Sequence, residues 1–244
     1  MLLPLKDINP TERRPVVTIT LIVVNVAIFL YQLSLGRYGH AFVASFGATP
    51  YEITHMEDLV GVVGYGINVA HYPGPKPIFM TLFSSMFLHG GFWHLGGNML
   101  YLWIFGNNIE DILGPVKYLI FYFLCGLAAH ALHIASDPSS YIPTVGASGA
   151  ISGLMGAYLI TYPKARVLTL VFLFYFIRLA VIPASFIIIW WFVVQFIFGM
   201  ASLGGSGGGV AWFAHIGGFI AGIILIYAMA WRIVYWLRHG GFDD

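Results

Sequence analysis

Long apolar stretches separated by short polar ones dominate the pattern of this 244-residue chain. A helix needs about 20 mostly apolar residues to cross a bilayer, and six stretches approach or reach that length. They are residues 16–35, 91–108, 116–136, 146–162, 183–201 and 210–230. The pattern therefore predicts an all-α fold, a polytopic membrane bundle of six transmembrane helices.

Two other apolar segments do not fit a simple count of spans. Residues 77–89 and 167–182 are apolar and run directly into the second and the fifth span. Each could be an interfacial or re-entrant piece, and the second could also be a seventh crossing, although it contains Arg178. Residues 36–77 form a long loop whose Gly, Pro and His content predicts no clear secondary structure.

Positive charges indicate the orientation, because Lys and Arg collect on the cytoplasmic side of a membrane protein. With six spans, nine of the eleven Lys and Arg residues fall on one face, and only Arg37 and Lys76 fall on the other. Both termini are therefore expected in the cytoplasm. A seventh crossing would move Arg232 and Arg238 outside, so we expect residues 167–182 to stay on the cytoplasmic side or in the interface.

Composition agrees with the membrane class, since 59% of the residues are hydrophobic and 9% are charged, whereas a soluble domain carries about 25% charged residues. The net charge of +1 does not suggest a nucleic-acid partner, and the single Cys125 excludes an intrachain disulfide and a cysteine zinc cluster. The N-terminus lacks the apolar core of a cleavable signal peptide. The expected parts are a cytoplasmic N-terminal segment (1–15), a six-span domain (16–230) with an outer loop (36–77), and a cytoplasmic tail (231–244). The expected location is a bacterial cytoplasmic membrane.

Polar side chains inside the predicted spans are costly to bury and are therefore candidates for function. They are Asn25, His94, Asn98, His130, His133, Ser148, Ser152, Gln195 and His215. Spans 2, 4 and 6 run in the same direction, and His94, Asn98, Ser148 and His215 lie in their first two turns. At 1.5 Å per residue, all four lie within roughly 10 Å of the outer ends of their helices. Three distant stretches thus bring a hydroxyl, two imidazoles and a carboxamide to one shallow depth.

Two of these spans have a face of small residues. The fourth carries Gly149, Gly153, Gly156 and Ala157 on one face, and the sixth carries Ala214, Gly218 and Gly222. Small residues at this spacing let membrane helices pack backbone against backbone. We expect this contact to bring Ser148 within hydrogen-bond reach of His215.

A serine hydroxyl becomes a good nucleophile when a neighbouring base accepts its proton, and His215 can do so as a neutral imidazole. No Asp or Glu lies within the six predicted ranges, which favours a Ser148–His215 dyad over a three-member relay. The tetrahedral intermediate also needs hydrogen-bond donors for its oxyanion. The backbone N–H of Ser148 and the side chains of Asn98 and His94, one turn apart on one face of span 2, are the candidates.

Three separated motifs carry a family resemblance. HGGFWHLGGN (89–98), GASGA (146–150) and AHIGGFIAG (214–222) closely resemble the signatures of rhomboid intramembrane serine proteases, in the same order and on the same spans. The resemblance covers residues from about 78 to 230 and implies a rhomboid-like fold. It also implies an enzyme that cleaves transmembrane segments of other proteins within the lipid bilayer, near the outer leaflet, and needs no metal or cofactor.

The resemblance assigns roles to individual residues. Ser148 is implied as the nucleophile, His215 as the general base, Asn98 and His94 as oxyanion partners, and His89 as a residue near the mouth of the site. We group Gly149, which follows the nucleophile, with the oxyanion and substrate-positioning residues. The expected partners are transmembrane protein substrates and the bilayer.

Two features depart from the common rhomboid pattern. Many rhomboids carry a Trp-Arg pair in the first outer loop, and residues 36–77 have none. Many also carry an aromatic residue four positions after the nucleophile that stacks on the base, and here this position is Ser152. Both members of the dyad are present, so a pseudoprotease is not the interpretation, but how the His215 ring is held stays open.

Other functions fit the sequence less well. A metalloprotease of the HExxH type is excluded because no His is followed by Glu. A transporter predicts a continuous polar track and inverted repeats, and a non-catalytic rhomboid-like protein that binds membrane helices is the other alternative. His130 and His133 could form a weak metal pair, although packing is the better interpretation. Asn25 and Gln195 are expected to form hydrogen bonds between helices.

Overall fold

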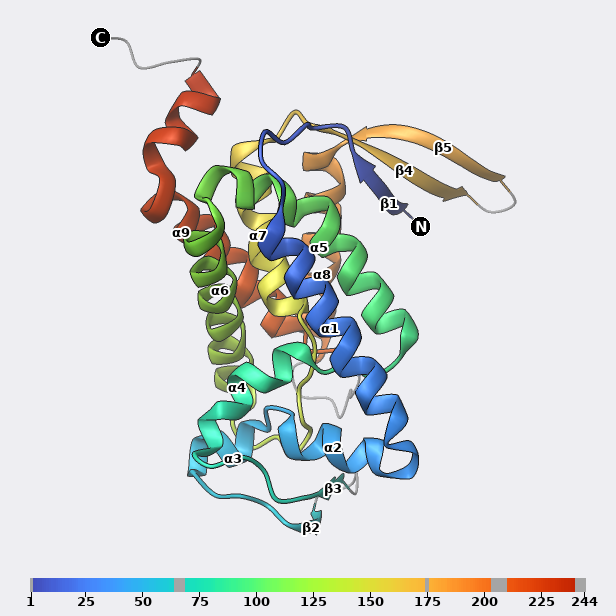
Figure 1. Ribbon diagram of the computed structural model, residues 1–244, viewed down its shortest axis with the longest axis vertical. Helices are drawn as coiled ribbons and strands as arrows, with labels where there is room; N and C mark the ends of the chain where they lie inside the picture. The colour runs from blue at the N-terminus through green and yellow to red at the C-terminus, as the bar shows by residue number, and fades with distance from the viewer. Residues whose placement is uncertain (1, 64–68, 174–175, 203–209, 240–244) are drawn as a thin grey trace.

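The computed structural model describes residues 2–63, 69–173, 176–202 and 210–239, and its fold is mostly helical (Figure 1). The helices are α1 (Val16–Ser34), α2 (Gly39–Phe46), α3 (Pro50–His55), α4 (Thr81–Ser84), α5 (Phe92–Leu113), α6 (Pro115–Ser136), α7 (Ser148–Thr161), α8 (Ala184–Ser202) and α9 (Trp212–His239). Single 3-10 turns are η1 (Gly36–Tyr38), η2 (Ile78–Met80) and η3 (Ser85–Phe87). The strands are β1 (Leu2–Asp7), β2 (Gly61–Val63), β3 (Val69–His71), β4 (Arg166–Leu173) and β5 (Phe176–Pro183). The predicted helical membrane bundle is confirmed, and two small sheets add to it.

Helices occupy all six ranges that were predicted as spans. Four of them, α1, α6, α8 and α9, are long and apolar enough to cross a membrane. α7 has only 14 residues, of which 11 are buried, because α5, α6, α8 and α9 pack around it. α5 has 22 residues but carries several polar ones toward its C-terminal end. The count of six crossings therefore stays a prediction.

α7 and α9 pack together along a seam of glycines. A Cβ atom on Gly222 would meet the backbone carbonyl oxygen of Gly153, and one on Gly218 would meet that of Gly149. The two backbones therefore approach without intervening side chains, as the small faces predicted. This seam places the N-terminal ends of α7 and α9 side by side.

The described residues between 166 and 183 form two paired strands, β4 and β5, here called the β-hairpin, which the hydropathy pattern did not predict. β4 pairs with both β1 and β5 in an antiparallel sheet, with Leu168 opposite Lys6 on one side and Val181 on the other. The segment is rich in β-branched and aromatic residues, which favour strands, whereas hydropathy alone does not separate a buried strand from a helix. Ala184 N–H donates to the Ala165 carbonyl oxygen at 2.8 Å, so the hairpin starts and ends at one end of the bundle (Figure 1). It is therefore not a seventh crossing.

Two helices continue past the predicted ends of their spans. α5 includes Glu110, a buried carboxylate that accepts hydrogen bonds from the backbone N–H groups of Val17 and Thr18 at 2.8 Å each. A carboxylate in this place satisfies free N–H groups in the first turn of α1 and complements its dipole. α9 changes direction at Ala230, with φ −146° and ψ 30°, and continues to His239.

The described parts of the outer loop are structured, although its composition predicted no clear secondary structure. The junction of α2 and α3 is bonded to the segment that leads into α7: Ala48 and Thr144 form a β-bridge with N–O distances of 3.0 and 2.9 Å. The Tyr51 N–H donates to the Ser140 carbonyl oxygen at 3.0 Å. Gly and Pro form defined turns as readily as irregular coil, so composition did not reveal this order. The loop thus holds the chain just ahead of Ser148.

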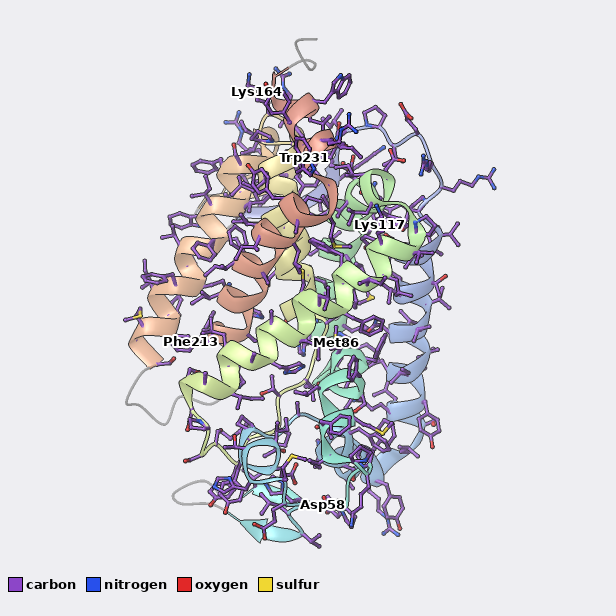
Figure 2. The ribbon with its side chains drawn as sticks, turned by 90° about the vertical axis from the view of Figure 1, so that its left-hand side faces the viewer. Asp58, Met86, Lys117, Lys164, Phe213 and Trp231 are labelled. Atoms are coloured by element: carbon purple, nitrogen blue, oxygen red, sulfur yellow. The ribbon has the colours of Figure 1, made fainter. Side chains whose placement is uncertain are left out.

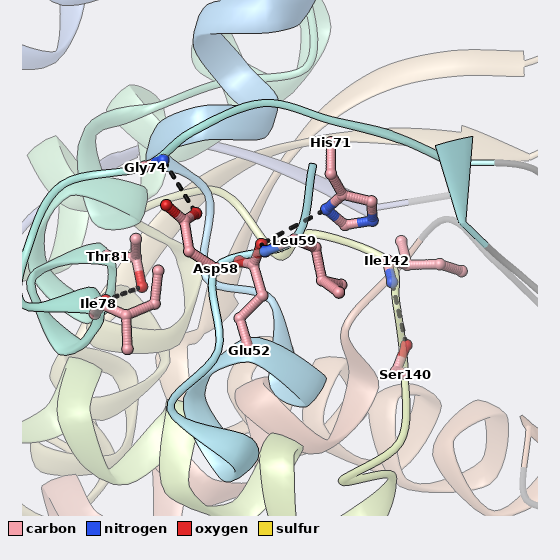
Figure 3. A network of polar contacts seen from close by, with 9 residues as sticks. All are labelled: Glu52, Asp58, Leu59, His71, Gly74, Ile78, Thr81, Ser140 and Ile142. Atoms are coloured by element: carbon pink, nitrogen blue, oxygen red, sulfur yellow. Dashed lines mark hydrogen bonds and ion pairs between the residues drawn. The ribbon is translucent and has the colours of Figure 1, made fainter. Parts of the chain in front are cut away.

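A polar network lies inside this outer loop (Figure 3). The Glu52 carboxylate lies 3.6 Å from Nδ1 of His71 and accepts a hydrogen bond from the Leu59 N–H at 3.1 Å, while Asp58 accepts one from the Gly74 N–H at 3.1 Å. Glu52 and His71 are both buried. Burial raises the pKa of the Glu52 carboxyl and lowers the pKa of the His71 imidazole, because each loses the hydration of its charged form.

The His71→Gln variant is expected to lose less outer-loop stability on acidification than the natural sequence. In the unfolded chain His71 takes up a proton near its ordinary pKa of 6.5, but in the folded loop only at lower pH. Its contribution to stability is therefore fully present above pH 6.5 and is lost as the pH falls through the lower, folded value. Gln takes up no proton, and Glu52 is common to both proteins. Hydrogen–deuterium exchange of residues 47–59 at pH 7 and pH 5, corrected for intrinsic rates, measures the difference; equal acceleration in both proteins would contradict it.

Candidate active site

Ser148 is the first residue of α7, and a tight glycine turn precedes it. Gly146 has a φ of +121°, a conformation that favours glycine, and a Cβ atom there would lie 2.8 Å from Nε2 of His94. The Gly146 N–H donates to the Ser85 carbonyl oxygen at 2.8 Å. Position 146 therefore requires glycine for two reasons, and the turn that it forms places Ser148 in the wall of a cavity.

His215 lies at the start of α9, opposite Ser148. Its Nε2 atom is 2.8 Å from the Ser148 Oγ atom, although 67 residues separate the two in the chain. This distance confirms the prediction that the glycine faces bring the hydroxyl and the imidazole within hydrogen-bond reach.

The second ring nitrogen of His215 is also engaged. Nδ1 lies 2.7 Å from Oε1 of Gln195, which comes from α8. The ring of Trp191, one turn earlier on α8, has its centroid 5.6 Å from that of His215, and Trp212 meets the imidazole edge-on at 6.5 Å. Side chains of α8 and α9 therefore surround the imidazole.

These ring contacts were not predicted from the sequence. Gln195 was expected to bond between helices, which it does, but its partner was not identified. Ser152, at the position where many rhomboids carry an aromatic residue, donates to the Ser148 carbonyl oxygen of its own helix at 2.6 Å. The four-residue spacing of Trp191 and Gln195 puts both on one face of a helix. This spacing is the feature of the sequence from which a shared contact could have been predicted.

Asn98 and His94 line the same cavity from α5. Nδ1 of His94 accepts a hydrogen bond from the Gly90 N–H at 3.2 Å, which leaves the proton of a neutral ring on Nε2, beside the Gly146 turn. Asn98 is buried, and its Nδ2 atom has no hydrogen-bond partner among the described residues. Two N–H donors of α5 therefore border the space next to Ser148.

His89 and Gly149 lie at different levels of the site. His89 is fully buried behind His94, with ring centroids 5.1 Å apart, and it is held by Gln32, whose Nε2 donates to the His89 carbonyl oxygen at 2.7 Å. Its side chain is fully buried and is not among the residues that line the cavity, so the expected place near the mouth gains no support here. Gly149 does line the cavity, and a Cβ atom there would lie 2.6 Å from Cβ of Ala129 on α6.

The cavity has a volume of about 820 Å³, which lies within the range of about 300–1,000 Å³ typical of binding pockets. Trp93, at its edge, is 95% exposed. Figure 2 shows Met86, which lines the cavity, and Phe213, near the start of α9, between Asp58 of the outer loop and Lys164 at the opposite end. The cavity therefore lies beneath the outer loop, inside the helical part of the molecule.

His130 has a partner other than His133. Its Nε2 atom lies 3.1 Å from Oγ of Ser85, and both side chains are buried. Ser85 also accepts the Gly146 N–H, so His130 supports the turn ahead of the nucleophile candidate. Within the described ranges, no group of three or more His, Cys, Asp and Glu side chains is placed to hold a metal ion.

Comparison with known proteins points to one family. A family model described as the Rhomboid domain matches residues 77–232. The chain is 32% identical over 148 residues to the Rhomboid protease GluP of Bacillus subtilis, which covers 61% of this chain and 25% of that protein. It is 33% identical over 97 residues to Rhomboid protein 1, mitochondrial, of Saccharomyces cerevisiae, covering 38% and 28% respectively. It is also 30% identical over 103 residues to the Presenilin-associated rhomboid-like protein, mitochondrial, of Homo sapiens, covering 41% and 27%. The matched part is thus less than a third of each of these relatives.

Proposed function

The chain belongs to the rhomboid family, and on this premise we propose that it is an intramembrane serine endopeptidase that cleaves transmembrane segments of other membrane proteins. The observation that carries the proposal is the 2.8 Å contact between Ser148 Oγ and His215 Nε2. This contact opens onto a cavity large enough for a stretch of peptide, lined also by Asn98 and His94. A purely structural Ser–His pair would not need such a cavity.

The dyad would act in two steps. Nε2 of His215 accepts the hydroxyl proton of Ser148 while Oγ forms a bond to the carbonyl carbon of the scissile peptide. The imidazolium then gives this proton to the leaving amine as the C–N bond breaks, which leaves an acyl-enzyme. A water molecule that enters the cavity repeats the sequence, with His215 again as base, and releases the new carboxylate.

The oxyanion of each tetrahedral intermediate would be stabilised from two sides. The first N–H groups of a helix have no partner within that helix, so the backbone N–H groups of Ser148 and Gly149 at the start of α7 are available. From α5, the unpartnered Nδ2 of Asn98 and the Nε2–H of His94 border the same space. Such donors stabilise charge that develops only in the transition state.

The Asn98→Ala variant is expected to lower kcat by about 10²–10³-fold with little change in KM, because one oxyanion donor is lost while the substrate contacts stay. The matched control is Asn25→Ala, since Asn25 is also buried in a helix but donates only to the Leu21 carbonyl oxygen of its own turn. Cleavage kinetics of a transmembrane substrate in detergent measure both variants. A rise in KM with kcat unchanged, or an equal fall in kcat in the two variants, would assign Asn98 to packing.

The proposed activity is tested with purified natural protein and the Ser148→Ala variant, each incubated with a model transmembrane substrate in detergent. The natural protein should release product and be labelled at Ser148 by a fluorophosphonate, and the variant should do neither. If the natural protein binds the substrate but neither cleaves it nor takes the label, the chain is a non-catalytic binder of membrane helices. Cleavage by the Ser148→Ala variant at the natural rate would reject the serine mechanism.

We also propose that both termini face the cytoplasm and that the site opens toward the outer leaflet of a bacterial cytoplasmic membrane. The distribution of Lys and Arg supports this orientation, and one relative is bacterial while two others are mitochondrial. A reporter fused after Pro183, at the end of the β-hairpin, is expected to be cytoplasmic in a bacterial host. An external signal from this fusion would contradict the proposed orientation of the chain in the membrane.

A further inference from the structure

The imidazole of His215 lies between a hydroxyl and a carboxamide. Nε2 is 2.8 Å from Ser148 Oγ, and Nδ1 is 2.7 Å from Gln195 Oε1. A neutral imidazole has one N–H and one lone pair, and a carboxamide oxygen can only accept a hydrogen bond. The proton must therefore lie on Nδ1 when this contact is made, and the lone pair on Nε2 faces the serine hydroxyl.

We infer that Gln195 is the positioning residue of the catalytic base: its carboxamide selects the tautomer of His215 that can accept the Ser148 proton, and it fixes the plane of the ring. The inference rests on the proposed function of the Ser148–His215 pair. Gln195 does not touch the reacting atoms and acts only through the imidazole. It would take the place that a carboxylate occupies in a three-member serine-protease triad.

The setting explains why a neutral side chain suits this place. Among the described residues no Asp or Glu lines the cavity, and Gln195 is 7% exposed. A carboxylate taken out of water at such a site is costly unless it is fully compensated, whereas an amide needs only its hydrogen bonds. An amide oxygen thus orients the imidazole without adding a buried charge inside the membrane.

Packing between α8 and α9 holds the two partners at hydrogen-bond distance. One turn after Gln195, a Cβ atom on Gly199 would lie 3.3 Å from Cβ of Trp212 and from Cδ1 of Ile216. One turn before it, Trp191 covers one side of the His215 ring. The carboxamide is therefore placed by close helix–helix contact on both sides, and not by a flexible loop.

The Gln195→Met variant keeps the length of the side chain but removes the acceptor oxygen. Loss of one hydrogen bond to a buried polar group is expected to reduce both kcat and the rate of fluorophosphonate labelling of Ser148 by about 10–100-fold, with KM unchanged. Gln195→Glu keeps an oxygen acceptor in place and is expected to recover more of the labelling rate than Gln195→Met does. Ile197→Met, on the exposed face of the same helix, is the matched control and should label at the natural rate.

The tautomer itself is the second measurement. Nitrogen-15 NMR of labelled histidine in the Ser148→Ala background should place the proton of His215 on Nδ1, and the added Gln195→Met change should move it toward Nε2. A proton on Nε2 with Gln195 intact, or natural kcat and labelling in Gln195→Met, would overturn the inference while leaving the serine mechanism untouched. A natural protein that neither labels nor cleaves would reject the proposed function instead, and the NMR measurement would still decide how His215 is held.

Discussion

Ser148→Ala, His215→Ala and the double variant are expected to lose peptide-bond cleavage to the same low level, at least about 10⁴-fold below the natural sequence. The reason is that the two side chains carry out a single proton transfer across their 2.8 Å contact. Once either is missing, the other has nothing to exchange a proton with, so the second change costs nothing more. The residual rate would come from the oxyanion donors and from substrate binding alone.

Single-turnover cleavage of a transmembrane substrate by the three variants measures this effect. Ser152→Ala is the matched control on the same helix, because its hydroxyl bonds only to the Ser148 carbonyl oxygen and its loss should change the rate by a few-fold at most. Losses that multiply in the double variant would mean that the two residues act independently. That result would remove the dyad from the mechanism.

Gly222→Ala is expected to lower the free energy of unfolding by about 1–3 kcal/mol and to slow fluorophosphonate labelling of Ser148 at the same time. The added Cβ would meet the backbone carbonyl oxygen of Gly153, and a backbone group in a helix cannot rotate out of the way. α7 and α9 would have to separate, and the Ser148–His215 contact depends on their approach. Stability and nucleophile reactivity should therefore fall together.

Gly96→Ala on α5 is the matched control, because a Cβ atom there would meet nothing within 4 Å. Ala is also the better helix former, so this variant should be as stable as the natural protein or slightly more stable. Thermal unfolding in detergent and the labelling rate are measured for both variants. If Gly222→Ala is as stable and as reactive as Gly96→Ala, the glycine seam is not what holds the two helices in register.

Some of the site residues could be placed from the sequence of their own helix, whereas the place of others depends on contacts with distant parts of the chain. Ser148 and His215 could be paired from the sequence because each lies near the start of a helix with a glycine face, and two such faces have few ways to pack. Asn98 was predicted for a similar reason, as a polar residue in the first two turns of a span. The burial of His89 could not be predicted, since one of its contacts is a hydrogen bond from Gln32 in α1 to its carbonyl oxygen, 57 positions away.

The β-hairpin and Glu110 show where hydropathy fails. An apolar segment of 16 residues is compatible with a helix or with two strands, and pairing with the N-terminal strand decides between them. Glu110 lay just beyond the predicted end of its span, yet it is buried because α1 begins beside it. In both cases the deciding partner lies far away in the sequence.

The sequence by itself determined the membrane class and the places of six helices, because the bilayer imposes a length and an apolar composition on the segments that cross it. It also determined that α7 and α9 can touch, because only small residues line their faces. The rotation of α8, and with it the contact between Gln195 and His215, was decided by tertiary packing alone. A polar residue on an apolar helix predicts that a hydrogen-bond partner exists, but only the arrangement of the neighbouring helices decides which residue that partner is.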